Sequence, residues 1–302
     1  SKFNLALNYF SFIIFGVIQG AWMVRKNKYD LVFVYGLSPI LLSIPGVFIS
    51  KIKGIQIILW VQDLWPESLL ATKSVQNGLV ISMVGLVVKW IYQSMDLILV
   101  QSHAFIDEVK KMTTEKDVKY YPNSVDPSFY NYSLNKQIDV EEEQKNDGKF
   151  NVVFAGNVGI GQGIEVILEA AKILSDIDNI QFVIYGSGSR LEWLEEQKKQ
   201  YNLKGIILKG RHPVESMPQL LSNANALLVT LSDEPIFAKT IPNKIQAYLA
   251  VGRPILACLN GEGARVVNEA KAGIAVPAGD SKRLSEAILN LYKLPEKEMS
   301  IY

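Results

Sequence analysis

Cysteine and histidine are nearly absent from this chain of 302 residues, which contains one cysteine, Cys258, and two histidines, His103 and His212. One cysteine rules out a disulfide framework and a thiolate zinc cluster, and it favours a reducing compartment. Two histidines that lie far apart in the sequence argue against a histidine-based metal centre. We therefore expect a cytoplasmic protein without a metal centre, and we also expect that it uses no cofactor.

The chain also lacks an excess of either charge, since 31 lysine and arginine residues balance 30 aspartate and glutamate residues for a net charge of +1. A general nucleic-acid binder would carry a basic excess, so we expect no nucleic-acid partner. The hydrophobic share of 49% and the charged share of 20% are typical of a globular chain. At this length the chain can form two hydrophobic cores.

One long apolar segment, residues 3–24, is long enough to be considered as a transmembrane helix. A signal peptide would place its basic residues first, whereas here Arg25, Lys26 and Lys28 follow the segment. Two interpretations remain, a core-facing helix with an extra exposed apolar stripe and a helix that lies on a membrane surface. We favour the core-facing helix, because the next apolar run, Leu31–Tyr35, is typical of a buried strand in an α/β unit.

Apolar runs with the length of strands alternate with longer helical stretches along the rest of the chain. The expected strands are Leu31–Tyr35, Ile55–Val61, Leu97–Gln101, Val118–Tyr121, Asn151–Ala155, Gln181–Tyr185, Gly205–Leu208, Ala226–Thr230, Pro254–Ala257 and Ile274–Val276. This repeated order predicts an α/β fold with parallel sheets that helices cover on both faces.

An acidic stretch with little apolar content, residues 124–149, interrupts the alternation. Charge runs of this kind are typical of solvated linkers. We therefore expect an N-terminal domain at residues 1–122, a linker at 123–148 and a C-terminal domain at 149–302. The N-terminal domain offers only about four strands, fewer than a doubly wound domain usually has, so we expect it to lack its first strands.

A glycine-rich loop joins the expected strand NVVFA to the expected helix IEVILEAAKIL. The loop contains Gly156, Gly159, Gly161 and Gly163, with Asn157 after the first glycine. Glycines at a strand–helix junction let the backbone approach a ligand and leave amide groups free for an anion. The spacing differs from the dinucleotide fingerprint, so we interpret the loop as a ligand-binding loop of another kind.

Two further loops follow strands of the same domain. Gly186 and Gly188 follow the strand QFVIY, a pattern that alone is typical of a turn. Arg211, His212 and Pro213 follow the strand GIILK. The carboxyl ends of parallel strands share one edge of a sheet, where ligands bind in open α/β folds, so we expect these loops to face one crevice.

A short helix is expected between Thr240 as its N-cap and Gly252 as its C-terminal stop, with Pro242 in the first turn. Asn243 and Lys244 fall in that first turn, where free amides and the positive end of the helix dipole suit a phosphate. A lysine there is unfavourable unless an anion lies nearby, although a solvent-facing Lys244 is the alternative. Together with the loops, this helix suits a nucleoside diphosphate better than a metal or a covalent intermediate.

Two carboxylates of the first domain follow the expected strand that ends at Val61. Asp63 and Glu67 lie in the sequence QDLWPE, at the carboxyl edge of that strand. A carboxylate there could bind sugar hydroxyls or take up a proton, and the alternative for Asp63 is a cap of the following turn. Trp65 between them is either an acceptor platform or part of the core, and we favour the core.

Several segments occur in an order that is specific to one protein family, namely LWVQDLWPES, YYPNSVD, AGNVGIGQGIEVILEAA, VIYGSGSRLEWLE, KGRHPVESMPQLLSNANALLVTL, TIPNKIQAYLAVGRPILA and NEAKAGIAVPAGD. Together they cover nearly the whole chain and resemble the retaining GT-B glycosyltransferases of family four. The most similar branch includes the fucosamine transferases of O-antigen and capsule assembly.

The resemblance implies two Rossmann-like domains whose parallel sheets face a cleft, with an activated sugar nucleotide in the C-terminal domain and an acceptor in the N-terminal one. It implies catalytic roles for Asp63, Arg211 and Lys244. It implies substrate binding by Gly156, Asn157, Gly159, Gly161, Gly186, Gly188, His212, Pro213, Thr240, Asn243 and Glu67.

The chain departs from the family pattern at several charged positions. Lys239 and Ala247 stand where most members carry paired glutamates, Asn157 and Gln162 replace the basic residues of the glycine loop, and Gln62 replaces an acceptor-side histidine. Neither the glutamate-assisted binding of the sugar nor the histidine role can therefore be transferred. Neutralisation of the phosphates must rest on Arg211 and Lys244.

The sequence thus predicts a retaining hexosyltransferase that moves a sugar from a nucleoside-diphosphate sugar, UDP-linked, to a lipid-linked or glycan acceptor in O-antigen or capsule biosynthesis. A lipid-linked acceptor would bring the protein to the inner face of the plasma membrane as a peripheral protein. The alternatives are a UDP-sugar epimerase of similar fold and a non-catalytic sugar-nucleotide-binding partner of a polysaccharide assembly.

Overall fold

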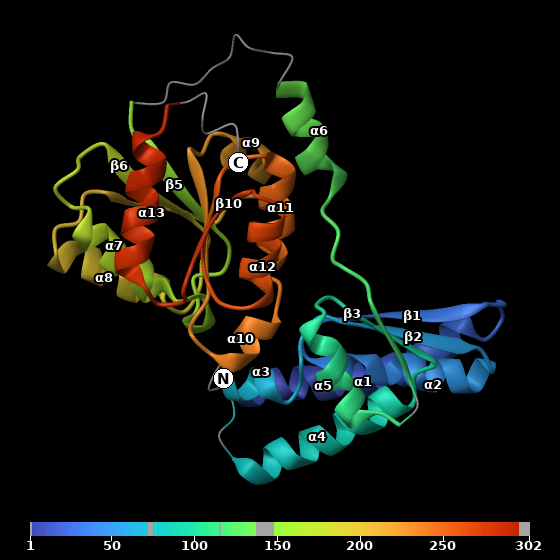
Figure 1. The fold of residues 1–302 in the computed structure, drawn as a ribbon. Helices are drawn as coiled ribbons and strands as arrows, with labels where there is room; N and C mark the ends of the chain where they lie inside the picture. Colours follow the sequence, from blue (N-terminus) through green and yellow to red (C-terminus); the bar gives the residue numbers. More distant parts are fainter. Residues whose placement is uncertain (1, 72–74, 76, 115, 137–147, 296–302) are drawn as a thin grey trace. The chain divides into compact units, whose positions relative to one another are not determined.

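The structure is a computed structural model, and it describes residues 2–71, 75, 77–114, 116–136 and 148–295 (Figure 1). The chain divides into two compact units, Ser1–Pro122 and Asn123–Tyr302. Each unit is an α/β body with its own parallel sheet.

The first unit has a four-stranded parallel sheet in the order β1-β2-β3-β4, which confirms the predicted number of strands. The strands are β1 (Leu31–Gly36), β2 (Gln56–Val61), β3 (Leu97–Val100) and β4 (Asp117–Tyr120). The helices are α1 (Lys2–Val24), η1 (Ile40–Ser43), α2 (Ile44–Lys53), α3 (Glu67–Ala71), α4 (Gly78–Gln93) and α5 (Ala104–Met112).

Strand β1 is only half-buried, although its sequence predicts a strand covered on both faces. Leu31, Phe33 and Tyr35 alternate along the strand and are 41–50% exposed. Phe33 and Tyr35 pack against Trp60 of β2, with ring centroids 6.4 and 5.1 Å apart. Because every position of β1 except the glycine is apolar, the sequence alone shows no difference between its two faces.

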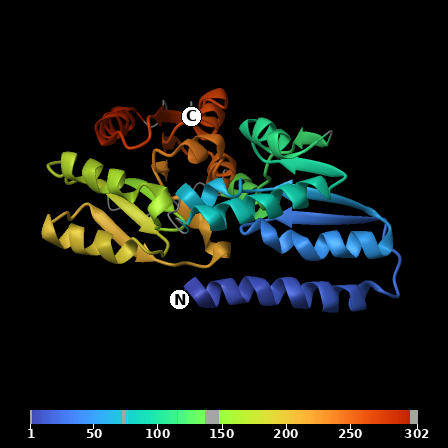
Figure 2. The same cartoon turned by 90° about the horizontal axis from the view of Figure 1, so that it is seen from below.

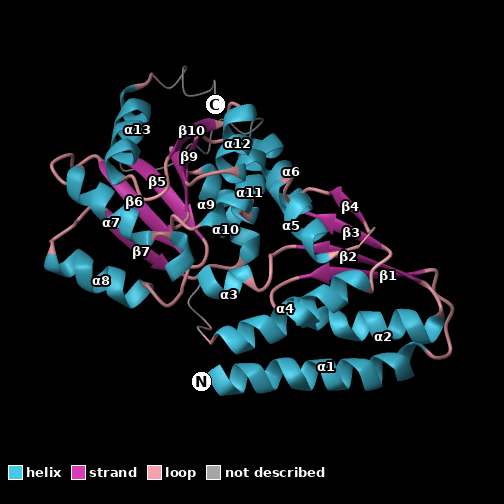
Figure 3. Ribbon diagram, turned by 60° about the horizontal axis from the view of Figure 1, so that its bottom comes forward, coloured by secondary structure: helices cyan, strands magenta, loops and turns pink. Residues whose placement is uncertain are grey.

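Helix α1 lies along α2 (Figures 2 and 3), and the two pack through glycines. A Cβ on Gly16 would lie 2.8 Å from Pro45 Cγ, and one on Gly20 would lie 3.0 Å from Ile49 Cδ1. No residue of Leu7–Val24 is buried, so the core-facing interpretation of this helix is wrong within the part of the chain that the structure describes.

The second unit has a six-stranded parallel sheet in the order β10-β9-β8-β5-β6-β7. The strands are β5 (Phe150–Ala155), β6 (Ile180–Tyr185), β7 (Ile206–Gly210), β8 (Ala226–Thr230), β9 (Ile255–Cys258) and β10 (Gly273–Val276). The helices are α6 (Pro127–Lys136), η3 (Ile160–Gln162), α7 (Ile164–Ile173), α8 (Leu191–Gln200), η4 (Val214–Ser216), α9 (Met217–Ser222), α10 (Pro235–Lys239), α11 (Asn243–Val251), α12 (Glu262–Glu269) and α13 (Ser281–Lys293).

Both faces of this sheet are buried, which explains its continuous apolar strands. Along β5, Val152 and Phe154 belong to the core under α7, α8 and α13, whereas Val153 belongs to the core under α9, α11 and α12. The chain runs outward from β5 through β6 and β7 and then returns to pair β8 with β5. Such a reversal opens a crevice at the carboxyl ends of the strands, and this is where ligands bind.

The predicted linker at residues 123–148 contains a helix that the sequence did not indicate. Helix α6 packs against α9 and α11, and its residue Phe129 is buried in the core of the unit. The acidic part of the predicted linker, residues 137–147, lies outside the described residues.

Candidate functional site

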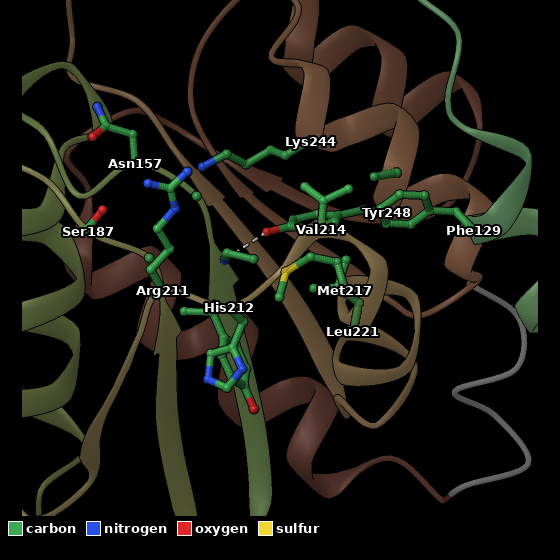
Figure 4. A pocket seen from close by; sticks show the side chains of 15 residues that line it. Phe129, Asn157, Ser187, Arg211, His212, Val214, Met217, Leu221, Lys244 and Tyr248 are labelled. Carbon is green, nitrogen blue, oxygen red and sulfur yellow. Dashed lines mark hydrogen bonds between the residues drawn. The ribbon is translucent and has the colours of Figure 1, made fainter.

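A cavity of about 430 Å³ lies at the carboxyl edge of the second sheet (Figure 4). The ends of β5 and β6 and the loops after β5, β6 and β7 supply part of the lining, and helices α6, η4, α9 and α11 supply the rest. The lining residues are Phe129, Ala155, Gly156, Asn157, Tyr185, Gly186, Ser187, Arg211, His212, Val214, Met217, Leu221, Lys244, Ala247 and Tyr248. Ligands of open α/β sheets bind at this edge, so the cavity is the candidate site.

The loops after β5 and β6 meet backbone against backbone beside the cavity. Gly186 has φ +148°, and a Cβ there would lie 1.8 Å from the carbonyl oxygen of Gly156. A Cβ on Gly188 would lie 2.3 Å from the carbonyl oxygen of Val158, whose own amide donates to Ser187 at 2.9 Å. Only glycine permits this approach at both positions. Gly186 lines the cavity, whereas Gly188 does not.

Gly159 and Gly161 do not line the cavity, although the sequence predicts that they bind substrate. A Cβ on Gly161 would lie 2.9 Å from Phe237 Cζ, and one on Gly159 would lie 2.6 Å from Asn157 Nδ2. Ser232, after β8, donates from its amide to the carbonyl oxygen of Gly161 at 3.1 Å. Gly159 and Gly161 thus pack against Asn157 and Phe237, and Gly156 is the glycine of this loop that lines the cavity.

Lys244 reaches from the first turn of α11 into the cavity. Its Nζ donates to Oε1 of Gln162 at 2.8 Å and lies 4.0 Å from the ring centroid of Phe154. Burial lowers the pKa of Lys244 to about 7, because desolvation disfavours the ammonium form. The solvent-facing alternative for this side chain is therefore wrong.

Helix α11 begins two residues later than the sequence predicts. Pro242 is the N-cap, with no side chain capping the helix. The Thr240 hydroxyl instead donates to the carbonyl oxygen of Ile236 in α10 at 3.0 Å, so Thr240 does not cap α11. The predicted stop is confirmed, since Gly252 is the C-cap with φ +70°. The absence of a capping side chain leaves the first amides of α11 available to an anion.

Arg211 and His212 extend from the end of β7 and are exposed. The His212 ring lies edge-on to the Tyr185 ring, with centroids 5.1 Å apart. Within the described part of the chain, Arg211 has no salt-bridge partner, and Figure 4 shows it on the same side of the cavity as Lys244. The described lining contains cations and no carboxylate, so its electrostatics favour an anionic ligand.

The opposite side of the cavity is apolar. Tyr248 is 1% exposed, and its hydroxyl accepts from the amide of Ala155 at 3.2 Å and donates to the carbonyl oxygen of Leu228 at 3.3 Å. These bonds tie α11 to the centre of the sheet. Phe129, Val214, Met217 and Leu221 complete the apolar wall. A cavity with cations at one end and apolar side chains at the other matches a ligand with a charged part and a flat apolar part.

The cavity of the second unit is lined by only part of the predicted catalytic and substrate-binding residues. The predicted residues that line the cavity are Gly156, Asn157, Gly186, Arg211, His212 and Lys244. Those that do not line it are Gly159, Gly161, Gly188, Pro213, Thr240 and Asn243. The apolar wall was missed, because its residues resemble ordinary core positions in the sequence.

Asp63 and Glu67 belong to the first unit. Asp63 lies beside Ser38, and burial raises the pKa of its carboxyl while a hydrogen bond with Ser38 opposes that rise. Glu67 is exposed at the first position of α3. Trp65 is 7% exposed and donates from Nε1 to Ser38 Oγ at 3.1 Å, so the core interpretation of Trp65 is confirmed.

Two parallel α/β sheets, one with a cation-lined cavity at its strand ends, define a Rossmann-like fold. Residues 135–302, more than half of the chain, match the family described as glycosyl transferases group 1. The chain belongs to this family.

Two curated relatives come from bacteria. WcaI of Escherichia coli (strain K12), whose name places it in colanic acid biosynthesis as a glycosyl transferase, is 25% identical over 76% of this chain. WbjE of Pseudomonas aeruginosa, named as a glycosyltransferase, is 25% identical over 89% of this chain. The chain spans 57% of the length of WcaI and 68% of the length of WbjE.

Solved structures show the same fold, that of GT-B proteins. Anabaena HepE in complex with UDP has a TM-score of 0.72 and 15% identity, covering 94% of this chain and 74% of HepE. The UDP-forming α,α-trehalose-phosphate synthase of Burkholderia vietnamiensis has a TM-score of 0.72 and 13% identity, covering 97% of this chain and 73% of the synthase. The predicted α/β fold with two parallel sheets is therefore confirmed.

Proposed function

We propose that this protein transfers a sugar, with retention of configuration, from a UDP-linked donor to a lipid-linked or glycan acceptor in cell-surface polysaccharide biosynthesis. The observation that carries the proposal is the pair of cations, Arg211 and Lys244, in a cavity whose described lining has no carboxylate. The names of WcaI and WbjE and the UDP bound to HepE support the reaction class and the nucleotide.

The cavity suits such a donor in both of its halves. The diphosphate would lie against Lys244, Arg211 and the first amides of α11, and the base would lie against the apolar wall that contains Met217 and Leu221. When the bond to the sugar breaks, negative charge develops on the departing diphosphate. Preorganised cations and amides stabilise that charge, and this is often the largest contribution to an enzyme's rate. Asp63 and Glu67 are proposed to act on the acceptor side.

The test is product analysis by mass spectrometry, with a panel of UDP-sugars and lipid-diphosphate acceptors. We expect transfer of one sugar and release of UDP, both dependent on the acceptor. Conversion of the donor to another UDP-sugar without any acceptor would identify an epimerase instead. Donor binding without turnover across the whole panel would identify a non-catalytic binding partner.

We further propose that α1 makes a peripheral contact with an anionic membrane. Within the described residues, one window, Leu7–Val24, is long and apolar enough to cross a membrane. The glycine contacts with α2 hold α1 along its own unit, however, and this arrangement supports a helix that lies in the interface. Phe10, Phe15, Ile18 and Trp22 are 57–64% exposed on it.

Cations follow directly at the end of α1. The Arg25 guanidinium lies 3.9 Å from the Trp22 ring centroid, and Lys53 donates from Nζ to the carbonyl oxygens of Arg25 and Asn27 at 3.2 and 2.9 Å. Lys26 and Lys28 are exposed beside them. Basic groups next to an apolar helix add attraction to anionic lipids of about 1 kcal/mol per charge near the surface.

We expect the protein to float with vesicles that contain anionic lipid and to remain in solution with neutral ones. Changing Arg25, Lys26 and Lys28 to Gln together with Phe12 and Phe15 to Ser should abolish flotation, because both the charge and the exposed apolar area are removed.

The matched control changes the exposed residues Lys204, Lys271 and Lys282 of the second unit to Gln, which removes the same charge elsewhere. This control should float like the unmodified protein. Flotation that survives the α1 changes, or that is lost equally in the control, would exclude α1 as the membrane contact.

A further inference from the structure

The ammonium group of Lys244, on α11, is held by one stretch of the second unit that lies far from it in sequence, namely the end of β5 and the loop after it. It donates to Gln162 of η3 at 2.8 Å and lies 4.0 Å from the Phe154 ring of β5. A Cβ on Gly156 would lie 3.3 Å from its Nζ, so the missing side chain at this glycine leaves the space that the ammonium occupies. The ammonium therefore has a defined place, set by the surrounding loop as much as by α11.

Gln162 projects from a turn that the backbone holds in place. Its amide donates to the carbonyl oxygen of Gly159 at 3.0 Å, and its own carbonyl oxygen accepts from the hydroxyl of Thr230. Gly163, the next residue, has φ +59°, and a Cβ there would lie 3.1 Å from the carbonyl oxygen of Leu231. The turn is thus anchored to the end of β8, so the Gln162 side chain starts from a fixed point.

The decisive feature is that Gln162, which accepts the hydrogen bond from Lys244, carries no charge. A carboxylate at position 162 would also hold Lys244, but it would cancel the positive charge and repel an anion. The neutral amide oxygen of Gln162 orients the ammonium and leaves its full charge for a ligand. In this partly desolvated place an uncancelled cation attracts an anion more strongly than it would in water.

We infer that Gln162 is a positioning residue that holds the Lys244 ammonium for the donor diphosphate, and that positions 162 and 244 together form one cation site. The inference rests on the proposed function. Because the tips of the two side chains touch, an ammonium carried from either position reaches the same place beside Gly156.

The first test exchanges the two side chains. Lys244→Gln should weaken the binding of UDP, measured by calorimetry, by about tenfold or more, because it removes a charge-assisted contact. The double variant Gln162→Lys/Lys244→Gln should restore most of the affinity, to within about threefold of the unmodified protein. Double-variant affinity no better than that of Lys244→Gln, in a protein whose circular dichroism shows it folded, would overturn the inference.

The second test uses Gln162→Leu and the pH dependence of UDP binding. Removing the amide oxygen of Gln162 should weaken the binding of UDP about two- to tenfold. It should also shift the pH at which affinity is lost to a lower value, because the Lys244 ammonium loses a partner that favours its charged form. The exposed Gln200→Leu on α8 is the control and should change neither quantity. An unchanged pH profile in Gln162→Leu would show that Gln162 only packs.

Measuring the binding of UDP and pyrophosphate to the unmodified protein distinguishes a failure of this inference from a failure of the proposed function. If it binds neither UDP nor pyrophosphate, the proposed function fails and the inference fails with it. If it binds UDP but the exchange does not restore affinity, only the role of Gln162 is excluded.

Discussion

Replacing Lys244 by alanine is expected to weaken UDP binding by about ten- to a hundredfold, because a charge-assisted hydrogen bond contributes about 1.5–3 kcal/mol. Arg211→Ala is expected at the lower end of that range, since Arg211 is exposed and solvent screens its charge. The sugar-transfer rate should fall with the affinity. The measurement is calorimetric titration with UDP.

The control for charge is Lys282→Ala on the exposed face of α13, which should bind UDP normally. Thermal unfolding should be nearly unchanged in all three variants, because none of the side chains belongs to the hydrophobic cores. Normal UDP affinity in both Lys244→Ala and Arg211→Ala would show that the cavity is not the donor site.

The same titration has a defined pH dependence. Burial sets the pKa of Lys244 at about 7 in the empty cavity, below the ordinary lysine value, and a bound anion raises it. The contribution of Lys244 to affinity is therefore fully present below pH 7 and declines as the pH rises toward the pKa of the complex. Above pH 7, binding should take up a proton, which titrations in buffers of different ionisation enthalpy detect. Lys244→Ala should remove this proton uptake.

Gly186→Ala is expected to destabilise the second unit by about 3–5 kcal/mol, since strained backbone and steric overlap both add to the cost. The new Cβ would lie 1.8 Å from the carbonyl oxygen of Gly156, a backbone atom that can move only with its loop, at φ +148°. The melting temperature should fall by roughly 6–15 °C, and UDP binding should be lost. Differential scanning calorimetry reports the first effect.

Gly279→Ala is the matched control, because Gly279 also has a positive φ, +76°, but its Cβ would meet no atom within 4 Å. Gly279→Ala introduces the backbone strain without the steric overlap. It should therefore lower the free energy of unfolding by only about 1 kcal/mol and leave UDP binding intact. Equal effects of the two substitutions would mean that the close approach of the loops after β5 and β6 does not matter for the site.

The sequence predicted the sheet of the second unit well, because its central strands β5, β6, β8 and β9 are largely buried on both faces and read as apolar runs. It also predicted the carboxyl-edge loops, since glycines mark the positions where backbone meets backbone. It failed for α6, whose polar sequence has no helical signal. That helix forms because Phe129 packs into the core beside α9 and α11.

The sequence likewise singled out Lys244, which lines the cavity, but not the residues that surround it. Lys244 stands out in the sequence because a lysine is unfavourable in the first turn of a helix. Nothing in the sequence relates it to Gln162, which lies 82 residues earlier. The family resemblance showed that the usual basic residues of the glycine loop are missing. The structure shows that Lys244, from helix α11, reaches this loop and contacts Gln162.

By itself, the sequence determined the α/β class, the parallel strands and the glycine turns, because periodicity and backbone freedom are local properties of the chain. The tertiary structure decided which face of α1 stays exposed, which glycines face the cavity and which serve packing. It also decided where the Lys244 ammonium lies. These outcomes depend on distances between residues far apart in the chain, and no local pattern encodes such distances.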